Sequence, residues 1–465
     1  MNLLIAATVT LILGYLFYGR FVEKIFNPDD RKTPAVEVND GVDCVPISTW
    51  RAFLIQLLNI AGTGPVFGAL MGAVFGPIVF LWIVFGCILG GAVHDYFTGM
   101  ISERHGGASI AELMRIYFGQ GVGRIMRLVS VVLLILVGAV FVIGPAMLLQ
   151  VLLGDVCSLE CLIIIILVYY TLSTFLPIDV LIARLYPVFG VVLLTMAAGI
   201  YYNILVGNFV LPTFTFANAH SELTVWPFLF TTVACGAISG FHATQSPLIA
   251  KCIKSEKVGR QVFYGAMIGE GIIALAWAAA GLSFYDSPVA LDLALAQFGP
   301  SGVVHDISIG MMGQWGGILA ILGVVICPIT SGDTAFRAAR LILAEILHLP
   351  QDVLWKRLLV TLPILAVGGI LTQVNFSMLW RYFAWTNQTL AALSLWMIVV
   401  YFFRHHQKQK SWVVAVPAIF MTAVVVTYIV KAKEGFALPL ALANQLGIAV
   451  ALAMALFYVY KVVKK

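Results

Sequence analysis

Two long apolar stretches of this chain are interrupted by residues whose types suit the binding of a carboxylate or an ion. The first interruption is residues 59–65 (Asn-Ile-Ala-Gly-Thr-Gly-Pro), and the second is residues 236–247 (Gly-Ala-Ile-Ser-Gly-Phe-His-Ala-Thr-Gln-Ser-Pro). Glycine permits unusual backbone angles, and proline lacks a backbone N–H. A half-helix that starts at such a break presents free N–H groups and the positive end of its dipole, which suit an anion.

The polar residues in and near these breaks are the candidate substrate ligands. Unwound backbone is costly in lipid, so we expect the breaks to line a polar cavity. Two simpler interpretations stay open, because glycine in membrane helices also serves packing and a buried histidine can merely join two helices by a hydrogen bond. The candidates are Gln56, Asn59, Gly62, Thr63, Gly64, Ser239, His242, Thr244, Gln245, Thr330, Ser331 and Asn387.

Four ionisable residues in apolar segments are candidates for coupling transport to a proton: His94, Asp95, Glu270 and Asp333. An intramembrane carboxylate is costly and by default marks function, and histidine exchanges a proton near neutral pH. The pair His94–Asp95 could instead anchor a helix end near Arg104 or Arg337.

A third break is predicted at residues 327–334 (Cys-Pro-Ile-Thr-Ser-Gly-Asp-Thr). Asp333 and Arg337 stand four residues apart, which is the spacing of a helical ion pair. Arg337 is therefore either part of a structural pair or a gate that contacts an anion. Both interpretations stay open.

The cysteines do not predict a metal site. The sequence has seven of them but no C-x-x-C pair and no histidine at zinc spacing, so we expect neither a metal nor a cofactor. Cys157 and Cys161 share a short loop, where a disulfide and two free thiols are both possible.

Composition requires lipid as the solvent for these segments. Hydrophobic residues make up 61% of the chain and charged residues 11%, and the mean hydropathy is +1.00. At about 20 apolar residues per crossing, about thirteen transmembrane helices are predicted. They lie near residues 2–18, 49–72, 73–100, 124–152, 160–177, 181–206, 225–250, 258–282, 304–336, 355–372, 376–402, 412–430 and 439–462.

The basic residues predict the orientation. Of the 27 lysines and arginines, all but Arg381, Lys431 and Lys433 lie in alternate loops or ends that share one side of the membrane. The positive-inside rule makes that side cytoplasmic, which predicts an external N terminus and a cytoplasmic C terminus. The scattered charges form no nucleic-acid patch. Residues 108–118 are too short to span and are expected to form an amphipathic helix on the cytoplasmic surface.

The two predicted breaks occupy corresponding positions in two sets of five spans. They fall in the first and sixth of the ten spans that remain when the first and the last two are set aside. Because five is odd, the second set is inverted, as in leucine-transporter-type carriers. The predicted fold is thus all-α, with an extra helix and loop in 1–48, repeats in 49–206 and 207–403, and two final helices in 404–465.

Several separated runs resemble signatures of the carbon starvation protein A family. They are 59–65, 90–95 (Gly-Gly-Ala-Val-His-Asp), 239–242 (Ser-Gly-Phe-His), 331–337 (Ser-Gly-Asp-Thr-Ala-Phe-Arg) and 26–34 (Phe-Asn-Pro-Asp-Asp-Arg-Lys-Thr-Pro). The resemblance implies a bacterial inner-membrane carrier linked to carbon starvation. It further implies peptides as substrates for some members and proton-coupled pyruvate uptake for others.

Together these observations predict a secondary active transporter. The sequence has no G-x-x-x-x-G-K-[ST] run, which argues against an ATP-driven pump. It also has no G-x-S-x-G or H-E-x-x-H run, so we expect no enzyme activity. Proton-coupled uptake of a small carboxylate such as pyruvate is favoured, with a di- or tripeptide as the alternative substrate and sodium as the alternative ion. A passive channel and a nutrient sensor are the alternatives from other classes.

Overall fold

The computed structural model describes residues 2–39, 44–175, 178–207, 209–220, 222–285, 287–351 and 353–464. These residues form helices and no strand. The helices are α1 Asn2–Leu13, α2 Gly19–Phe26, α3 Pro34–Glu37, α4 Thr49–Ala61, α5 Ala69–Ala73, α6 Val79–Leu81, α7 Ala92–Arg104, α8 Ile110–Phe118, α9 Gln120–Leu153, α10 Leu159–Ser173, α11 Ile178–Val206, α12 Val225–Thr232, α13 Gly240–Ala250, α14 Gly265–Phe284, α15 Pro288–Ile346, α16 Leu354–Leu371, α17 Phe376–Arg404, α18 Trp412–Lys431 and α19 Leu440–Val463. Four π-helical segments, Gly14–Tyr18, Gly64–Gly68, Trp82–Gly91 and Arg260–Tyr264, continue into α2, α5, α7 and α14.

Ten helical spans in the described part of the chain are long and apolar enough to cross a membrane, or eleven if the bent pair of α4 and α5 forms one span. The prediction of an all-α polytopic membrane protein is therefore confirmed. The segment α10, with 15 residues, and the interrupted pair α12 and α13 coincide with two further predicted spans. The number thirteen stays a prediction.

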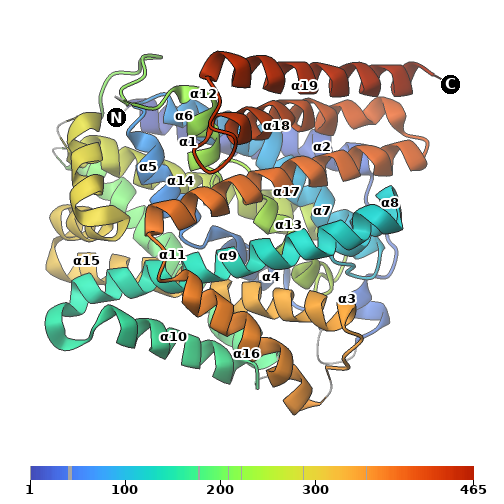
Figure 1. Cartoon of the computed structure of the whole chain (residues 1–465), viewed down its shortest axis with the longest axis horizontal. Helices are drawn as coiled ribbons and strands as arrows, with labels where there is room; N and C mark the ends of the chain where they lie inside the picture. Colours follow the sequence, from blue (N-terminus) through green and yellow to red (C-terminus); the bar gives the residue numbers. More distant parts are fainter. Residues whose placement is uncertain are drawn as a thin grey trace.

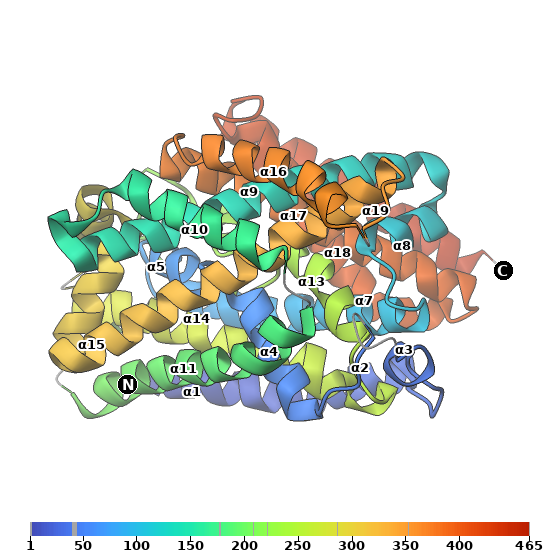
Figure 2. The ribbon, with the colours of Figure 1, turned by 90° about the horizontal axis from the view of Figure 1, so that it is seen from below.

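The long helices run roughly along one axis of the molecule, and the two chain ends lie toward opposite ends of it (Figure 1, Figure 2). Burial separates the core from the periphery. The most apolar window of the span Ala320–Ile346 in α15 is 83% buried, and that of α9 is 78% buried. The corresponding window of α19 is only 11% buried. The last helix thus leaves most of its surface to lipid.

The first predicted break is present. Helix α4 ends at Ala61, and Gly62 follows with a φ of 42°, where a side chain would be strained. A Cβ at this position would also lie 2.3 Å from the ring of Phe141. Beyond the break the chain re-enters a π-helical turn and then α5, bent by 58° relative to α4. The backbone thus changes direction in the middle of a span.

The second break is present but shorter than predicted. Of the predicted break, only the part that lies in the link between α12 and α13 is non-helical. Residues from Gly240 through Pro247 belong to helix α13. Hydroxyl groups bond back to carbonyls in this helix, from Thr244 Oγ1 to Phe241 O at 2.6 Å and from Ser246 Oγ to His242 O at 3.0 Å. Such bonds let polar residues remain inside a helix. The polar run was therefore wrongly interpreted as unwound throughout.

The predicted third break at 327–334 is wrong. Helix α15 continues through Pro328, and its non-helical residues are Gly299 and Gly313, each with a φ of 69°. A proline can be accommodated within a membrane helix. Three residues further on, Ser331 Oγ lies 3.0 Å from the carbonyl of Cys327 and 2.9 Å from that of Leu58, which joins α15 to α4. The predicted span 304–336 thus begins in a separate helical segment before Gly313.

The predicted amphipathic helix within 108–118 is observed as α8. Ser109 Oγ accepts a hydrogen bond from the backbone N–H of Glu112 at 3.3 Å and so caps the helix. Arg115 pairs with Glu112 and holds the pKa of that carboxyl below its usual value. Apolar side chains such as Leu113 and Met114 are buried against the bundle. The cytoplasmic location of α8 stays a prediction.

Candidate functional site

The two breaks touch each other inside the bundle. A Cβ added to Gly64 would lie 2.1 Å from Cys235 Cβ, and one added to Gly236 would lie 3.8 Å from Pro65 Cα. Only a residue without a side chain lets the backbones approach this closely. The first break therefore crosses directly over the link between α12 and α13, and side chains from both converge on one point.

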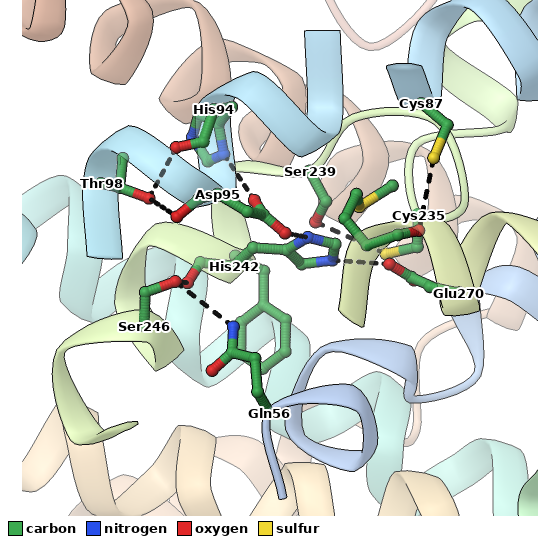
Figure 3. A network of polar contacts seen from close by, with 12 residues as sticks. Gln56, Cys87, His94, Asp95, Thr98, Cys235, Ser239, His242, Ser246 and Glu270 are labelled. Carbon is green, nitrogen blue, oxygen red and sulfur yellow. Dashed lines mark hydrogen bonds and ion pairs between the residues drawn. The ribbon is translucent and has the colours of Figure 1, made fainter. Parts of the chain in front are cut away.

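A chain of four buried ionisable residues lies beside this crossing (Figure 3). Asp95 of α7 accepts contacts at both oxygens, from His94 Nδ1 at 2.8 Å and from His242 Nδ1 of α13 at 2.8 Å. The other ring nitrogen of His242, Nε2, faces Glu270 Oε2 of α14 at 3.4 Å. All four side chains are 0% exposed. Of the predicted coupling residues, His94, Asp95 and Glu270 thus come together around His242.

His242 stands between two carboxylates, which constrains the protons in the cluster. A protonated His242 ring has a donor for Asp95 at one nitrogen and for Glu270 at the other. Buried charges must be paired or neutralised, so two bare carboxylates cannot share this site without a proton. Gain or loss of one proton therefore changes the net charge of a fully enclosed site by one unit. Such a site suits proton coupling.

A second group of polar side chains lies at the first break and carries unused hydrogen-bonding atoms. Gln56 Nε2 lies 3.4 Å from Ser246 Oγ of α13, whereas its Oε1 has no hydrogen-bond partner. Both polar atoms of the Asn59 side chain, together with Thr63 Oγ1 and Gln245 Oε1, are also buried and without partners. Buried polar atoms without partners are rare in proteins and ask for an explanation. The first break thus carries neutral donors and acceptors that no protein group occupies.

Asn387 of α17 fixes the start of α13. Its Oδ1 accepts a hydrogen bond from the backbone N–H of Phe241 at 2.6 Å, and its Nδ2 lies 3.0 Å from Ser239 Oγ. Asn387 thus acts as a cap supplied by another helix. Because the N–H of Phe241 already donates to Asn387, it is not free for a ligand. Asn387 and Ser239 therefore hold the second break in position. Thr244 is likewise occupied by the carbonyl of Phe241 and by Gln245 Nε2 at 2.9 Å.

The remaining predicted residues lie on α15 in two places. Ser331 joins α15 to the end of α4 through Leu58, and the hydroxyl of Thr330 lies 2.8 Å from the carbonyl of Cys327. Asp333 accepts a short hydrogen bond from Ser173 Oγ of α10, and Arg337 Nη2 lies 3.5 Å from Asp333 Oδ2. The predicted ion pair is therefore present, and its further partners come from α10, not from the cluster around His242.

The structure also decides where Asp95 finds its partners. The alternative prediction was that His94 and Asp95 anchor the helix end near Arg104 or Arg337. Arg104 instead binds Glu256 through Nε at 2.7 Å and Nη2 at 3.0 Å, and Arg337 pairs with Asp333. Glu256 further accepts a hydrogen bond from the backbone N–H of Asp29 in the loop after α2. Arg31 lowers the pKa of the exposed Asp29 well below its usual value. This end of α7 thus has its own ion-pair cluster.

Sequence reasoning missed several residues of the site. Cys235 lies in the second break and could have been noticed from its position directly before Gly236. Phe141 gave no signal, because it contacts Gly62 and Phe241 from α9, whose pattern shows no break. Cys235, His242 and Glu270 together could hold a metal ion. Cys157 and Cys161 carry free thiols.

The fold and the site define a polytopic membrane transporter in which two interrupted helices meet at a buried ionisable cluster. The same fold occurs in a manganese transporter of Eremococcus coleocola, with a TM-score of 0.59 over 91% of this chain and 99% of that chain. Only 12% of the aligned residues are identical, so this likeness concerns the fold alone.

The chain belongs to the carbon starvation protein CstA family, whose model matches residues 1–152, 149–286 and 289–428. This confirms the resemblance found in the motifs. An uncharacterized membrane protein of Haemophilus influenzae is 44% identical over 62% of this chain and 92% of its own length. A protein of Escherichia coli named peptide transporter CstA is 24% identical over 95% of this chain and 83% of its own length. The pyruvate/proton symporter BtsT of Escherichia coli is 26% identical over 59% of this chain and 48% of its own length.

Proposed function

We propose that this protein is a proton-coupled secondary active transporter that imports a small carboxylate of the pyruvate class. The observation that carries the proposal is the buried chain from Asp95 through His242 to Glu270 at the second break. A proton held there changes the charge of an enclosed site that adjoins the non-helical link between α12 and α13. Proton binding and rearrangement of the break are thereby linked.

The substrate is proposed to bind at the crossing of the two breaks. Asn59, Gln56 and Gln245 contribute amide groups, and Thr63 contributes a hydroxyl, with several of these polar atoms buried and without partners. A carboxylate or keto oxygen can accept hydrogen bonds from such amide donors. Gly62 and Gly64 allow the ligand to approach the backbone. The named relative BtsT, a pyruvate/proton symporter, supports this assignment.

The finer architecture belongs to the same proposal. We infer thirteen spans, with residues 49–206 and 207–403 as inverted five-helix repeats, and with 1–48 and 404–465 as flanking segments. The two interrupted helices support this arrangement, because such pairs mark transporter sites in inverted repeats. Alternating access then comes from rocking of a bundle that contains both breaks. The basic residues support an external N terminus and a cytoplasmic C terminus in a bacterial inner membrane.

A peptide is the second candidate substrate. Relatives from Escherichia coli, Bacillus subtilis and Helicobacter pylori are named peptide transporter CstA. A peptide needs partners for an amine as well as for a carboxylate, and Glu270 or Asp95 could bind the amine. Binding of a peptide amine at these residues would compete with the coupling proton, whereas a monocarboxylate at the amides would not.

The test is uptake of labelled pyruvate into proteoliposomes, with and without an inward proton gradient, and with a dipeptide as competitor. Accumulation of pyruvate that requires the proton gradient and is not reduced by the dipeptide supports proton-coupled carboxylate transport. A dipeptide that accumulates instead of pyruvate moves the assignment to peptides. Equilibration without accumulation identifies a passive channel, and binding without any flux identifies a sensor.

The coupling residues are tested in the same vesicles. Asp95→Asn and Glu270→Gln are expected to abolish gradient-driven accumulation while leaving exchange of labelled for unlabelled substrate. Glu112→Gln, which changes a carboxylate on the amphipathic helix α8, serves as the control and should behave as the unaltered protein. Unchanged pH dependence of uptake in Asp95→Asn would remove this residue from the coupling site.

A further inference from the structure

The second ring nitrogen of His242 forms no hydrogen bond with any described protein group. Its Nε2 is buried and has no hydrogen-bond partner. The two carboxylate oxygens of Glu270 are also buried, and neither of them has a hydrogen-bond partner. The 3.4 Å between His242 Nε2 and Glu270 Oε2 exceeds the roughly 2.7–2.9 Å of a charge-assisted hydrogen bond. Two strong ligand groups thus face each other at a separation that suits two ligands of one tetrahedral metal ion lying to one side of the line between them.

Cys235 completes a set of three ligands at this place. One ligand atom each from Cys235, His242 and Glu270 lies within 4.8 Å of the others, and all three residues are buried. Figure 3 shows the thiol beside the imidazole and the carboxylate. The three residues come from the second break, from α13 and from α14, so no local spacing in the sequence could reveal them. The expectation of no metal site rested on local spacing alone.

We propose that Cys235 Sγ, His242 Nε2 and the Glu270 carboxylate bind a divalent transition-metal ion of the zinc class. Zinc takes sulfur, nitrogen and carboxylate oxygen as ligands, whereas magnesium and calcium prefer oxygen alone. Around tetrahedral zinc, ligand atoms are about 3.5 Å apart. His242 Nε2 and Glu270 Oε2 already lie 3.4 Å apart, and all three ligand atoms lie within 4.8 Å of one another, so closing the site needs a movement of at most about 1.3 Å. The fourth position falls to a water molecule, as is usual for zinc with three protein ligands.

The surroundings of His242 support this assignment independently. Its Nδ1 is joined to Asp95 Oδ2 at 2.8 Å, and His94 holds the other oxygen of that carboxylate. Ligating histidines commonly donate their other N–H to a carboxylate, which fixes the tautomer and increases the basicity of the ligating nitrogen. With the Nδ1–H bound to Asp95, the lone pair of His242 lies on Nε2 and is directed toward Glu270.

A bound ion would connect three segments whose relative movement the proposed transport cycle requires. Cys235 lies in the unwound link, His242 begins the second half-helix, and Glu270 belongs to the continuous helix α14. An ion held by all three prevents α13 and the link from moving relative to α14. The ion is therefore an inhibitor that arrests transport. This consequence rests on the proposed function, whereas the binding itself does not.

Binding is measured directly on purified protein in nanodiscs, with Zn²⁺ in a chelator competition and Co²⁺ as a spectroscopic probe. Because Cys157 and Cys161 are neighbouring free thiols, all proteins carry Ser at both positions. One ion per chain and a near-ultraviolet sulfur-to-cobalt band are expected. Cys235→Ser should remove the band and weaken binding at least tenfold, and Glu270→Gln should also weaken it. Cys87→Ser, which changes another buried cysteine, is the matched control and should bind as before.

The inhibitory role is measured as the fraction of uptake lost on adding Zn²⁺, relative to the metal-free rate of each variant. Inhibition should persist in Cys87→Ser and decrease in Cys235→Ser. Equal affinity in Cys235→Ser, or no bound ion, overturns the site. Accumulation of labelled zinc inside the vesicles overturns the inhibitory role. If no solute is transported but binding depends on Cys235, the site stands and only the proposed function fails.

Discussion

Asn387 and Phe241 are joined by a 2.6 Å hydrogen bond between a side-chain oxygen of α17 and the backbone N–H in the first turn of α13. The two helices are also in close backbone contact, since a Cβ on Gly240 would lie 2.3 Å from the Asn387 carbonyl. The start of the half-helix that carries His242 is therefore set by a neighbouring helix. A displacement of α17 changes the position of His242.

Asn387→Ala should destabilise the protein by about 1–3 kcal/mol, because it leaves the buried N–H of Phe241 without a partner. Thermal unfolding in detergent measures the loss. The matched control is Asn375→Ala, which removes the exposed cap of α17 at Met378 and should have an effect of at most about 1 kcal/mol. Equal losses in the two variants would mean that burial of the Asn387 cap has no special role.

Gly64→Ala should abolish transport and lower stability, because its methyl group would overlap Cys235 Cβ. The double variant Gly64→Ala with Cys235→Gly removes the opposing Cβ and should recover much of the thermal stability. Gly121→Ala, where no atom lies within 4 Å, is the control and should be neutral. A Gly64→Ala protein of normal stability would contradict the close crossing of the two breaks.

Glu256→Gln should release the loop after α2, because it breaks the bidentate pair with Arg104 and the contact to Asp29. Removing one partner of such a pair destabilises by about 3–5 kcal/mol when the other charge remains buried. Amide hydrogen exchange of residues 27–37 measures the release. Asp30→Asn removes only the exposed pair with Lys257 and should leave exchange unchanged.

The same loop has a predictable pH response. Arg31 lowers the pKa of Asp29, so the stability from this carboxylate is fully present above its unfolded pKa of about 4. It is lost only as the pH falls through the lower folded pKa. The part of the exchange protection that Asp29 contributes, measured as the difference between the unaltered protein and Asp29→Asn, should therefore be constant between pH 5 and pH 8. A difference of zero at pH 7 would show that Asp29 does not hold the loop.

Ser173→Ala should destabilise the protein by about 1–3 kcal/mol, because the buried carboxyl group of Asp333 loses its hydrogen-bond partner. Ser130→Ala is the control, since Ser130 Oγ is buried without a partner and its removal should be neutral or stabilising. Denaturant or thermal unfolding compares the two. A larger loss in Ser130→Ala would contradict the assigned partner of Asp333.

The sequence predicted the helical segments and the first break well, because apolar length and the Gly-Thr-Gly-Pro run are local signals. It predicted too long a second break, because a polar run looks unwound even when hydroxyls bond back to the helix, as Thr244 and Ser246 do. The break at 327–334 was wrong for a related reason. Helix α15 continues through Pro328, because a proline can be accommodated within a membrane helix and does not by itself mark a break.

Within the site, residue types were predictable but their partners were not. Asp95, Glu270 and His242 were selected because ionisable groups are costly in lipid. Their pairing brings α7 to α13 and α14, which lie more than 130 residues later in the chain, and an anchor for His94 and Asp95 near Arg104 was equally compatible with the sequence. Cys235 joins this group through contacts with His242 and Glu270, and it carries no charge that would mark it in the sequence.

The adjacent pair His94 and Asp95 has a consequence for the order in which the protein is made. Synthesis delivers Asp95 to the membrane 147 residues before His242, its later partner in α13. His94 is already present, and its ring lies 2.8 Å from the first oxygen of Asp95. His94 therefore gives the nascent chain an immediate partner for a carboxylate that would otherwise enter lipid alone. In ribosome-stalled chains that end before residue 242, His94→Ala should reduce insertion of α7, and the effect should disappear when Asp95 is also replaced by Asn.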